Sequence, residues 1–198
     1  MIRLLAKKST YWFLRLVGFG FLVGYLLVTR DFAFSVKWVF GYFAIVALVA
    51  WVIVVVLDAP KRLPKLDRYH FFQMKARDQT KPLSEKEWVL KQAEYFESGF
   101  QKNAILLTPL EDGLICVPVI LAGIGPISAM LGGLVFGFLH LGRFTYLDCI
   151  GKTIIYGLVC LFILPHGLLT VVAGHFGVDL LSLVALKVIK AKALGGAP

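Results

Sequence analysis

Long apolar runs separated by short polar breaks dominate the chain. An apolar run of roughly 20 residues is long enough to cross a hydrocarbon layer about 30 Å thick as an α-helix. The pattern therefore predicts an all-α, polytopic membrane helix bundle with about six transmembrane helices. These runs cover, in chain order, about Tyr11–Val28, Trp38–Leu57, Asn103–Ile124, Pro126–Gly142, Ile150–Leu164 and Gly167–Leu186.

The segment 58–102 breaks this pattern, because it holds ten Lys/Arg and seven Asp/Glu residues. Ser84 and Glu87 form a capping-box pattern, and the apolar residues that follow lie on one face of a helix. The pattern predicts an amphipathic helix along the membrane surface. The expected organisation is an N-terminal transmembrane hairpin (1–57), a basic cytoplasmic loop containing this helix (58–102) and a four-helix membrane core (103–198).

Lysine and arginine lie unevenly between the runs, and this asymmetry predicts the orientation. With a cytoplasmic N-terminus, one side collects the basic loop, the N-terminal lysines and the C-terminal lysines, whereas the other keeps only Arg30 and Lys37. The expectation is a multi-pass integral membrane protein with both termini cytoplasmic. Arg15 lies inside the first run, and we expect its side chain to extend to the cytoplasmic interface.

Composition agrees with a membrane class. Of the 198 residues, 59% are hydrophobic, and the mean hydropathy is +0.80. The net charge of +9 does not indicate nucleic-acid binding, because the basic residues flank apolar runs. The cysteines at 116, 149 and 160 have no paired spacing and are expected to be small buried residues. The expected partners are membrane lipid and a peptide or membrane-protein substrate, with no cofactor and no bound metal.

Ionisable side chains inside the apolar runs are the strongest clue to function, because such residues are costly at membrane depth. Five acids and histidines lie there in the second half of the chain: Glu111, Asp112, His140, His175 and Asp179. At a rise of about 1.5 Å per residue, three separate helices place them in the cytoplasmic half of the bilayer. His175 and Asp179 are four residues apart and share a helix face. The sequence predicts one polar cavity open to the cytoplasm.

Each of these residues also has a purely structural interpretation. His140 could be a hydrogen-bonded core residue, and Asp179 could pair with a nearby lysine. Asp112 could be protonated and bonded to a carbonyl oxygen. His166, at the Pro165 turn, is expected at the interface and has no assigned role.

Three short motifs follow one another from Glu111 onward. Glu111-Asp112 begins the first, Phe136-Gly-Phe-Leu-His140 is the second and His175-Phe-Gly-Val-Asp179 is the third. Over about residues 106–183 the chain resembles the CPBP family of intramembrane peptidases, the CAAX-prenyl-protease and bacteriocin-processing type. The motifs of that family are EExxxR, FxxxH and HxxxN or HxxxD.

The resemblance implies a glutamic-type endopeptidase that cleaves a peptide bond near the cytoplasmic face of the membrane without a required metal. Glu111 and His140 would bind and activate a water molecule. His175 and Asp179 would stabilise the oxyanion or orient the substrate carbonyl. Two positions depart from the family motif: Asp112 replaces the second glutamate, and Cys116 replaces an arginine that would organise the acids.

Two other functions fit the same residues. The first is a catalytically inactive, CPBP-like subunit or scaffold of a larger membrane complex, which the altered first motif favours. The second is a metal-dependent hydrolase, since histidine and carboxylate ligands suit zinc or manganese. The histidines and acids do not form a compact ligand motif such as HExxH.

Overall fold

The computed structural model describes residues 8–56, 110–140 and 146–193, and all regular structure in these ranges is helical. A π-helical turn, Val52–Val56, continues α3, and a 3₁₀ turn, Leu164–His166, precedes the last helix. The α-helices are α2 (Lys8–Thr29), α3 (Val36–Trp51), α7 (Leu110–Leu121), α8 (Pro126–Leu139), α9 (Tyr146–Phe162) and α10 (Leu168–Ala193).

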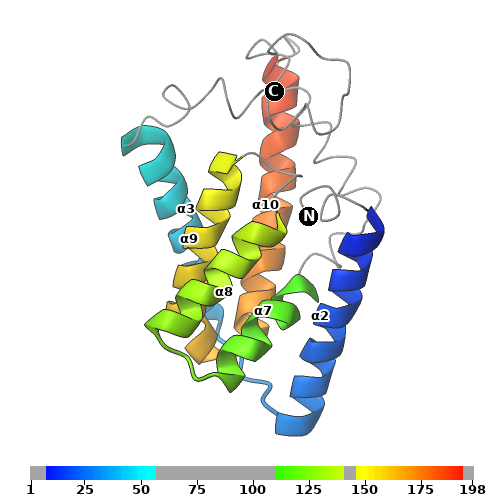
Figure 1. Cartoon of the computed structure of the whole chain (residues 1–198). Coiled ribbons are helices and arrows are strands. Elements are labelled where there is room, and N and C mark those ends of the chain that lie inside the picture. The colour runs from blue at the N-terminus through cyan, green and yellow to red at the C-terminus, as the bar shows by residue number, and fades with distance from the viewer. Residues whose placement is uncertain (1–7, 57–109, 141–145, 194–198) are drawn as a thin grey trace.

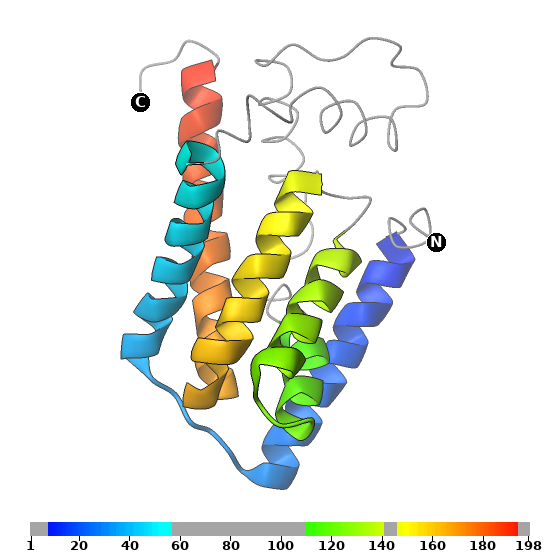
Figure 2. The ribbon, with the colours of Figure 1, turned by 60° about the vertical axis from the view of Figure 1, so that its left-hand side comes forward.

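The helices run side by side as a bundle, with their connecting turns gathered at one end (Figure 1). The α2–α3, α7–α8 and α9–α10 connections all lie at the lower end in both views (Figure 2). The first residues of α2 and the last residues of α8 and α10 lie toward the opposite end. The main packing pairs are α8 with α9, α2 with α7 and α10 with α3. The helices therefore run up and down in turn, in the order of the apolar runs in the sequence.

Two of the described chain reversals contain glycine and proline. Gly125 precedes Pro126, the first residue of α8, and the Ser128 hydroxyl accepts a hydrogen bond from the Gly125 N–H at 3.0 Å. Gly167 has φ 111°, and a β-carbon there would lie 2.1 Å from the carbonyl oxygen of Ala33. Only glycine fits both the backbone angle and this contact, so the α9–α10 turn is held against the α2–α3 loop.

The bundle has an apolar exterior as well as an apolar core. The core includes Ile115, Tyr156, Val159 and Leu168, which are at most 3% exposed. Large apolar side chains also cover the outside: Leu16 is 65% exposed and Ile127 is 73% exposed. Soluble monomers rarely expose so many large apolar groups together.

Among the helices that the structure describes, two are long and apolar enough to cross a membrane, and they contain the segments Trp12–Thr29 and Leu168–Ala185. The apolar helices Val36–Trp51, Pro126–Leu139 and Cys149–Phe162 are shorter. Over the described residues the predicted all-helical fold is confirmed, whereas the six-span arrangement and the cytoplasmic termini stay predictions. The basic loop 58–102, with its amphipathic helix, lies outside the described residues, as does the start of the predicted span at 103.

Two helix pairs approach closely enough that backbone atoms touch. A β-carbon on Gly113 of α7 would lie 2.0 Å from the Gly18 carbonyl oxygen of α2. A β-carbon on Gly137 of α8 would lie 1.9 Å from the Thr153 hydroxyl oxygen of α9. Glycines thus bring α2 against α7 and α8 against α9. These two contacts set the positions of the polar side chains described next.

Candidate functional site

Glu111 lies in the first turn of α7, where it faces α2 and the end of α8. Its side-chain oxygen Oε1 accepts a hydrogen bond from Arg15 Nε at 3.0 Å. Glu111 is 5% exposed and Arg15 is 6% exposed. Because water is largely excluded from both groups, the pair is a buried salt bridge between residues 96 positions apart in the chain.

His140 follows the last turn of α8 and is buried. Its Nδ1 lies 2.7 Å from the carbonyl oxygen of Phe136, and since that oxygen can only accept, Nδ1 carries the proton. In the neutral imidazole, Nε2 is then an acceptor. Nε2 lies 3.8 Å from Glu111 Oε2, too far for a direct hydrogen bond.

The Glu111–His140 geometry suits one shared water molecule. Glu111 Oε2 and His140 Nε2 are both acceptors, and no proton is available between them in the neutral state of the imidazole. A water molecule about 3 Å from each atom can donate one hydrogen to each. The distance of 3.8 Å between the acceptors permits this arrangement.

Asp112, the next residue in the chain, faces helices α9 and α10. Its carboxylate is fully buried, and Oδ1 accepts a hydrogen bond from the Tyr156 hydroxyl of α9. The same oxygen lies 2.8 Å from Nδ1 of His175 on α10. Tyr156 also contacts Cys116, with the sulfur 3.6 Å from the hydroxyl oxygen. Donors from two helices therefore stabilise this buried carboxylate.

His175 lies between two carboxylates. Its second ring nitrogen, Nε2, is 3.7 Å from Oδ2 of Asp179, one turn along α10. Within the described part of the chain, neither Asp112 Oδ2 nor Asp179 Oδ2 has a hydrogen-bond partner. The site therefore keeps buried acceptor atoms that a ligand or a water molecule could satisfy.

The ring of Phe136 lies between two groups of polar residues. The first is Glu111 with Arg15 and His140, and the second is Asp112 with Tyr156 and His175. The Phe136 ring stacks on Tyr156 with ring centroids 3.9 Å apart, and it lies 4.5 Å from the ring of His140. The rings of Phe136 and His175 form a T-shaped pair with their centroids 5.8 Å apart. The phenylalanine of the FxxxH motif is thus buried between the imidazoles and restricts how both can turn.

The five predicted residues come together from three helices, as the sequence predicts, although their chemical roles stay predictions. The structure agrees with some of the purely structural interpretations given above and not with others. His140 is indeed a hydrogen-bonded core residue, but it also faces Glu111. Asp112 accepts from a phenol and an imidazole instead of donating to a carbonyl, and Asp179 faces His175.

Arg15 overturns one expectation. The sequence predicts that its side chain extends to the interface, but it turns inward and binds Glu111. Cys116 does not leave the acids without a guanidinium, because α2 supplies one from elsewhere in the chain. The three cysteines are buried free thiols, as expected. His166 stacks on Trp38 with ring centroids 3.9 Å apart.

Sequence reasoning missed Tyr156 altogether. One signal could have found it: a tyrosine hydroxyl inside an apolar helix needs a buried partner, and an aspartate in another apolar helix is an obvious acceptor. For Arg15 the same reasoning would have asked which acid neutralises it.

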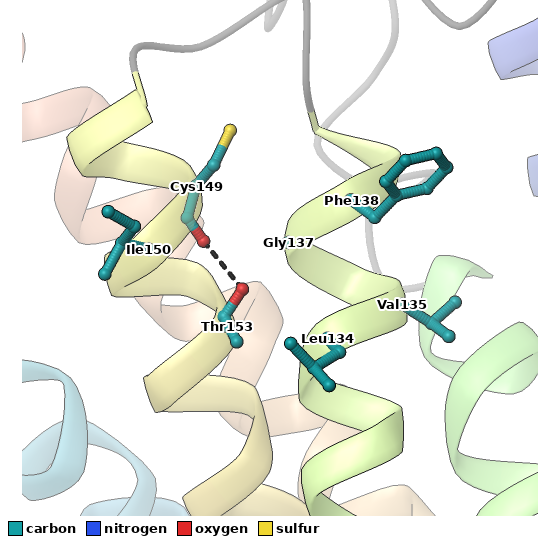
Figure 3. Close-up of a pocket in the computed structure, with 7 residues that line it drawn as sticks. All are labelled: Leu134, Val135, Gly137, Phe138, Cys149, Ile150 and Thr153. Carbon is teal, nitrogen blue, oxygen red and sulfur yellow. Dashed lines mark hydrogen bonds between the residues drawn. The ribbon is translucent and has the colours of Figure 1, made fainter. Parts of the chain in front are cut away.

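An open apolar groove of about 470 Å³ lies between α8 and α9. Figure 3 shows Gly137 of α8 facing Thr153 of α9, whose hydroxyl donates to the Cys149 carbonyl at 2.9 Å. None of the five ionisable residues lines this groove. Its lining consists of Leu134, Val135, Gly137, Phe138, Cys149, Ile150 and Thr153.

Among the described residues, no group of three or more histidine, cysteine, aspartate or glutamate side chains is arranged to hold a metal ion. Comparison with models of protein families found no match. Neither the curated proteins nor the solved structures contain a match to the chain. The resemblance to the CPBP family therefore rests on its three motifs and stays a prediction.

Proposed function

We propose that the chain is an intramembrane endopeptidase that activates water between Glu111 and His140. One observation carries this proposal: two buried acceptor atoms, one carboxylate oxygen and one imidazole nitrogen, lie 3.8 Å apart. A general base must lie within hydrogen-bond reach of the proton that it removes, directly or through one water. Here the proton to be removed would belong to the water molecule shared by Glu111 and His140.

The chemistry balances with side chains alone. As the water oxygen attacks the scissile carbonyl carbon, one of its protons passes to Glu111 or His140. The carbon–nitrogen bond then breaks, and that proton goes to the leaving amine. In this scheme His175 is the imidazolium, with a proton on each ring nitrogen, because it lies between the carboxylates of Asp112 and Asp179. Its Nε2, which is 3.7 Å from Asp179, donates toward the developing oxyanion. Asp112 holds the opposite ring nitrogen at 2.8 Å.

The apolar exterior supports the membrane setting of this proposal. Arg15 and four of the five predicted site residues are buried, whereas large apolar groups such as Leu16 and Ile127 are exposed. This distribution suits a protein whose outer surface meets lipid. Six spans with cytoplasmic termini would place the site in the cytoplasmic half of the bilayer, where the lysine and arginine asymmetry predicts substrate access.

A non-catalytic role in a larger membrane complex is the second candidate. It is favoured by aromatic side chains exposed on α2, α3 and the loop between them, which could contact a partner in the membrane. The exposed aromatic residues there are Phe13, Phe19, Phe21, Phe32, Phe34, Phe40 and Trp51.

Cleavage in liposomes separates these functions. The purified chain is reconstituted with a library of peptides, each fused to one transmembrane helix, and products are identified by mass spectrometry in ¹⁸O-labelled water. We expect ¹⁸O in the new carboxyl ends. Glu111→Gln or His140→Ala should reduce turnover by about 10²–10⁴-fold, which is the usual contribution of general acid–base catalysis.

Two results would contradict the proposal. Loss of cleavage with EDTA that zinc restores would identify a metal-dependent hydrolase. No cleavage by a folded chain that copurifies with one larger membrane complex would favour the scaffold. Arg30→Met serves as the control, because this arginine is exposed in the α2–α3 loop.

A further inference from the structure

Helix α2 reaches the candidate site through a single charged side chain. Arg15 lies three residues before Gly18, which is where α2 touches the backbone of α7. A β-carbon on Gly18 would lie 2.2 Å from the Leu110 carbonyl oxygen, next to Glu111. The close approach of the two helices therefore brings the guanidinium to the carboxylate at 3.0 Å.

The salt bridge uses one oxygen of Glu111 and leaves the other directed at His140. Oε1 accepts from Arg15, whereas Oε2 faces Nε2 of the imidazole. A carboxylate on a glutamate side chain can rotate about its last bond, and a bond to one oxygen limits that rotation. The guanidinium thereby determines where the second oxygen lies.

We propose that Arg15 is a positioning residue that orients Glu111 for water activation, so that the N-terminal helix completes the active centre. This inference rests on the proposed hydrolase function. It makes α2 part of the machinery, although none of the three motifs lies on α2. It also accounts for Cys116: an arginine there is not needed when α2 provides one.

Arg15→Met tests the inference, because methionine keeps much of the length without the charge. Its kcat on the tethered peptides should fall by about 10–100-fold, the usual cost of losing a group that orients a reacting one. KM should change little, because Arg15 binds Glu111 and not the peptide. Arg15→Lys should recover part of kcat, since an ammonium keeps the charge but not the planar fork.

Arg30→Met is the matched control, and it should keep the wild-type kcat and KM. If the control and Arg15→Met both cleave at the wild-type rate, the inference is wrong and the hydrolase stands. A purely structural salt bridge would instead change the amount of folded protein, with kcat per folded molecule unchanged.

A second measurement tests the pair even if the wild-type chain shows no cleavage. Arg15→Met leaves a buried carboxylate without its cation and should lower the apparent Tm. Adding Glu111→Gln removes that charge and should restore most of the loss. Additive losses in the double variant would show that the two side chains are not coupled, and the inference would fail independently of activity.

Discussion

Glu111 and Asp112 are neighbours in the chain, yet they occupy different environments. Glu111 is neutralised by an arginine on α2 and keeps one oxygen opposite an imidazole 3.8 Å away. Asp112 accepts from a phenol on α9 and an imidazole on α10. In the first centre, the distance between the two acceptors suits one shared water molecule. In the second centre, hydrogen bonds join Asp112 directly to Tyr156 and His175. We infer that this centre supports the structure of the site.

The largest expected difference between the centres concerns stability. Glu111→Leu removes the carboxylate of a buried salt bridge, which typically costs about 3–5 kcal/mol. Asp112→Asn keeps an oxygen that can accept from Tyr156 and His175, and we expect a cost of about 1–2 kcal/mol. Unfolding of the purified variants in mixed micelles with increasing SDS measures both values. Equal losses would contradict the distinction between the centres.

Tyr156→Phe sharpens the comparison within the second centre. Removing the hydroxyl leaves the fully buried Asp112 with one donor fewer, which should cost about 1–3 kcal/mol. Tyr25→Phe is the matched control, since the Tyr25 hydroxyl donates to Asp31 at 3.0 Å in a partly exposed setting. We expect the control to lose less than about 1 kcal/mol in the same unfolding assay. A larger loss in the control would argue against Tyr156 as support for Asp112.

Asp179→Asn should have the smallest effect. The Asp179 side chain is 17% exposed, and its oxygen lies 3.7 Å from His175 Nε2, beyond hydrogen-bond distance. Loss of so weak a pair should cost less than about 1 kcal/mol. The same unfolding series measures it. A loss as large as that of Glu111→Leu would make Asp179 a principal support of the site.

The sequence predicts much of this architecture. The Gly125-Pro126 pair and Gly167 lie at two chain reversals, because proline is favoured at the first position of a helix and glycine can adopt the positive φ found at Gly167. The cost of burying ionisable groups predicts that Glu111, His140 and His175 lie together. The spacing of four residues places His175 and Asp179 one turn apart on the same face of the helix.

The sequence does not predict which helices are neighbours across long separations. An apolar run such as that of α2 does not indicate which helix it will meet, so Arg15 could not be matched to Glu111. The contact depends on a backbone approach between Gly18 and Gly113, which are 95 positions apart. Tyr156 was missed for a related reason: aromatic residues are common in apolar helices, and only the structure brings its hydroxyl to Asp112.

The Arg15–Glu111 salt bridge has a consequence for biosynthesis. During translation α2 emerges with its charged guanidinium long before the ribosome reaches Glu111, which is 96 positions later. In the proposed membrane setting, this contact between α2 and α7 forms only after α7 has been synthesised, so it is a late event of assembly.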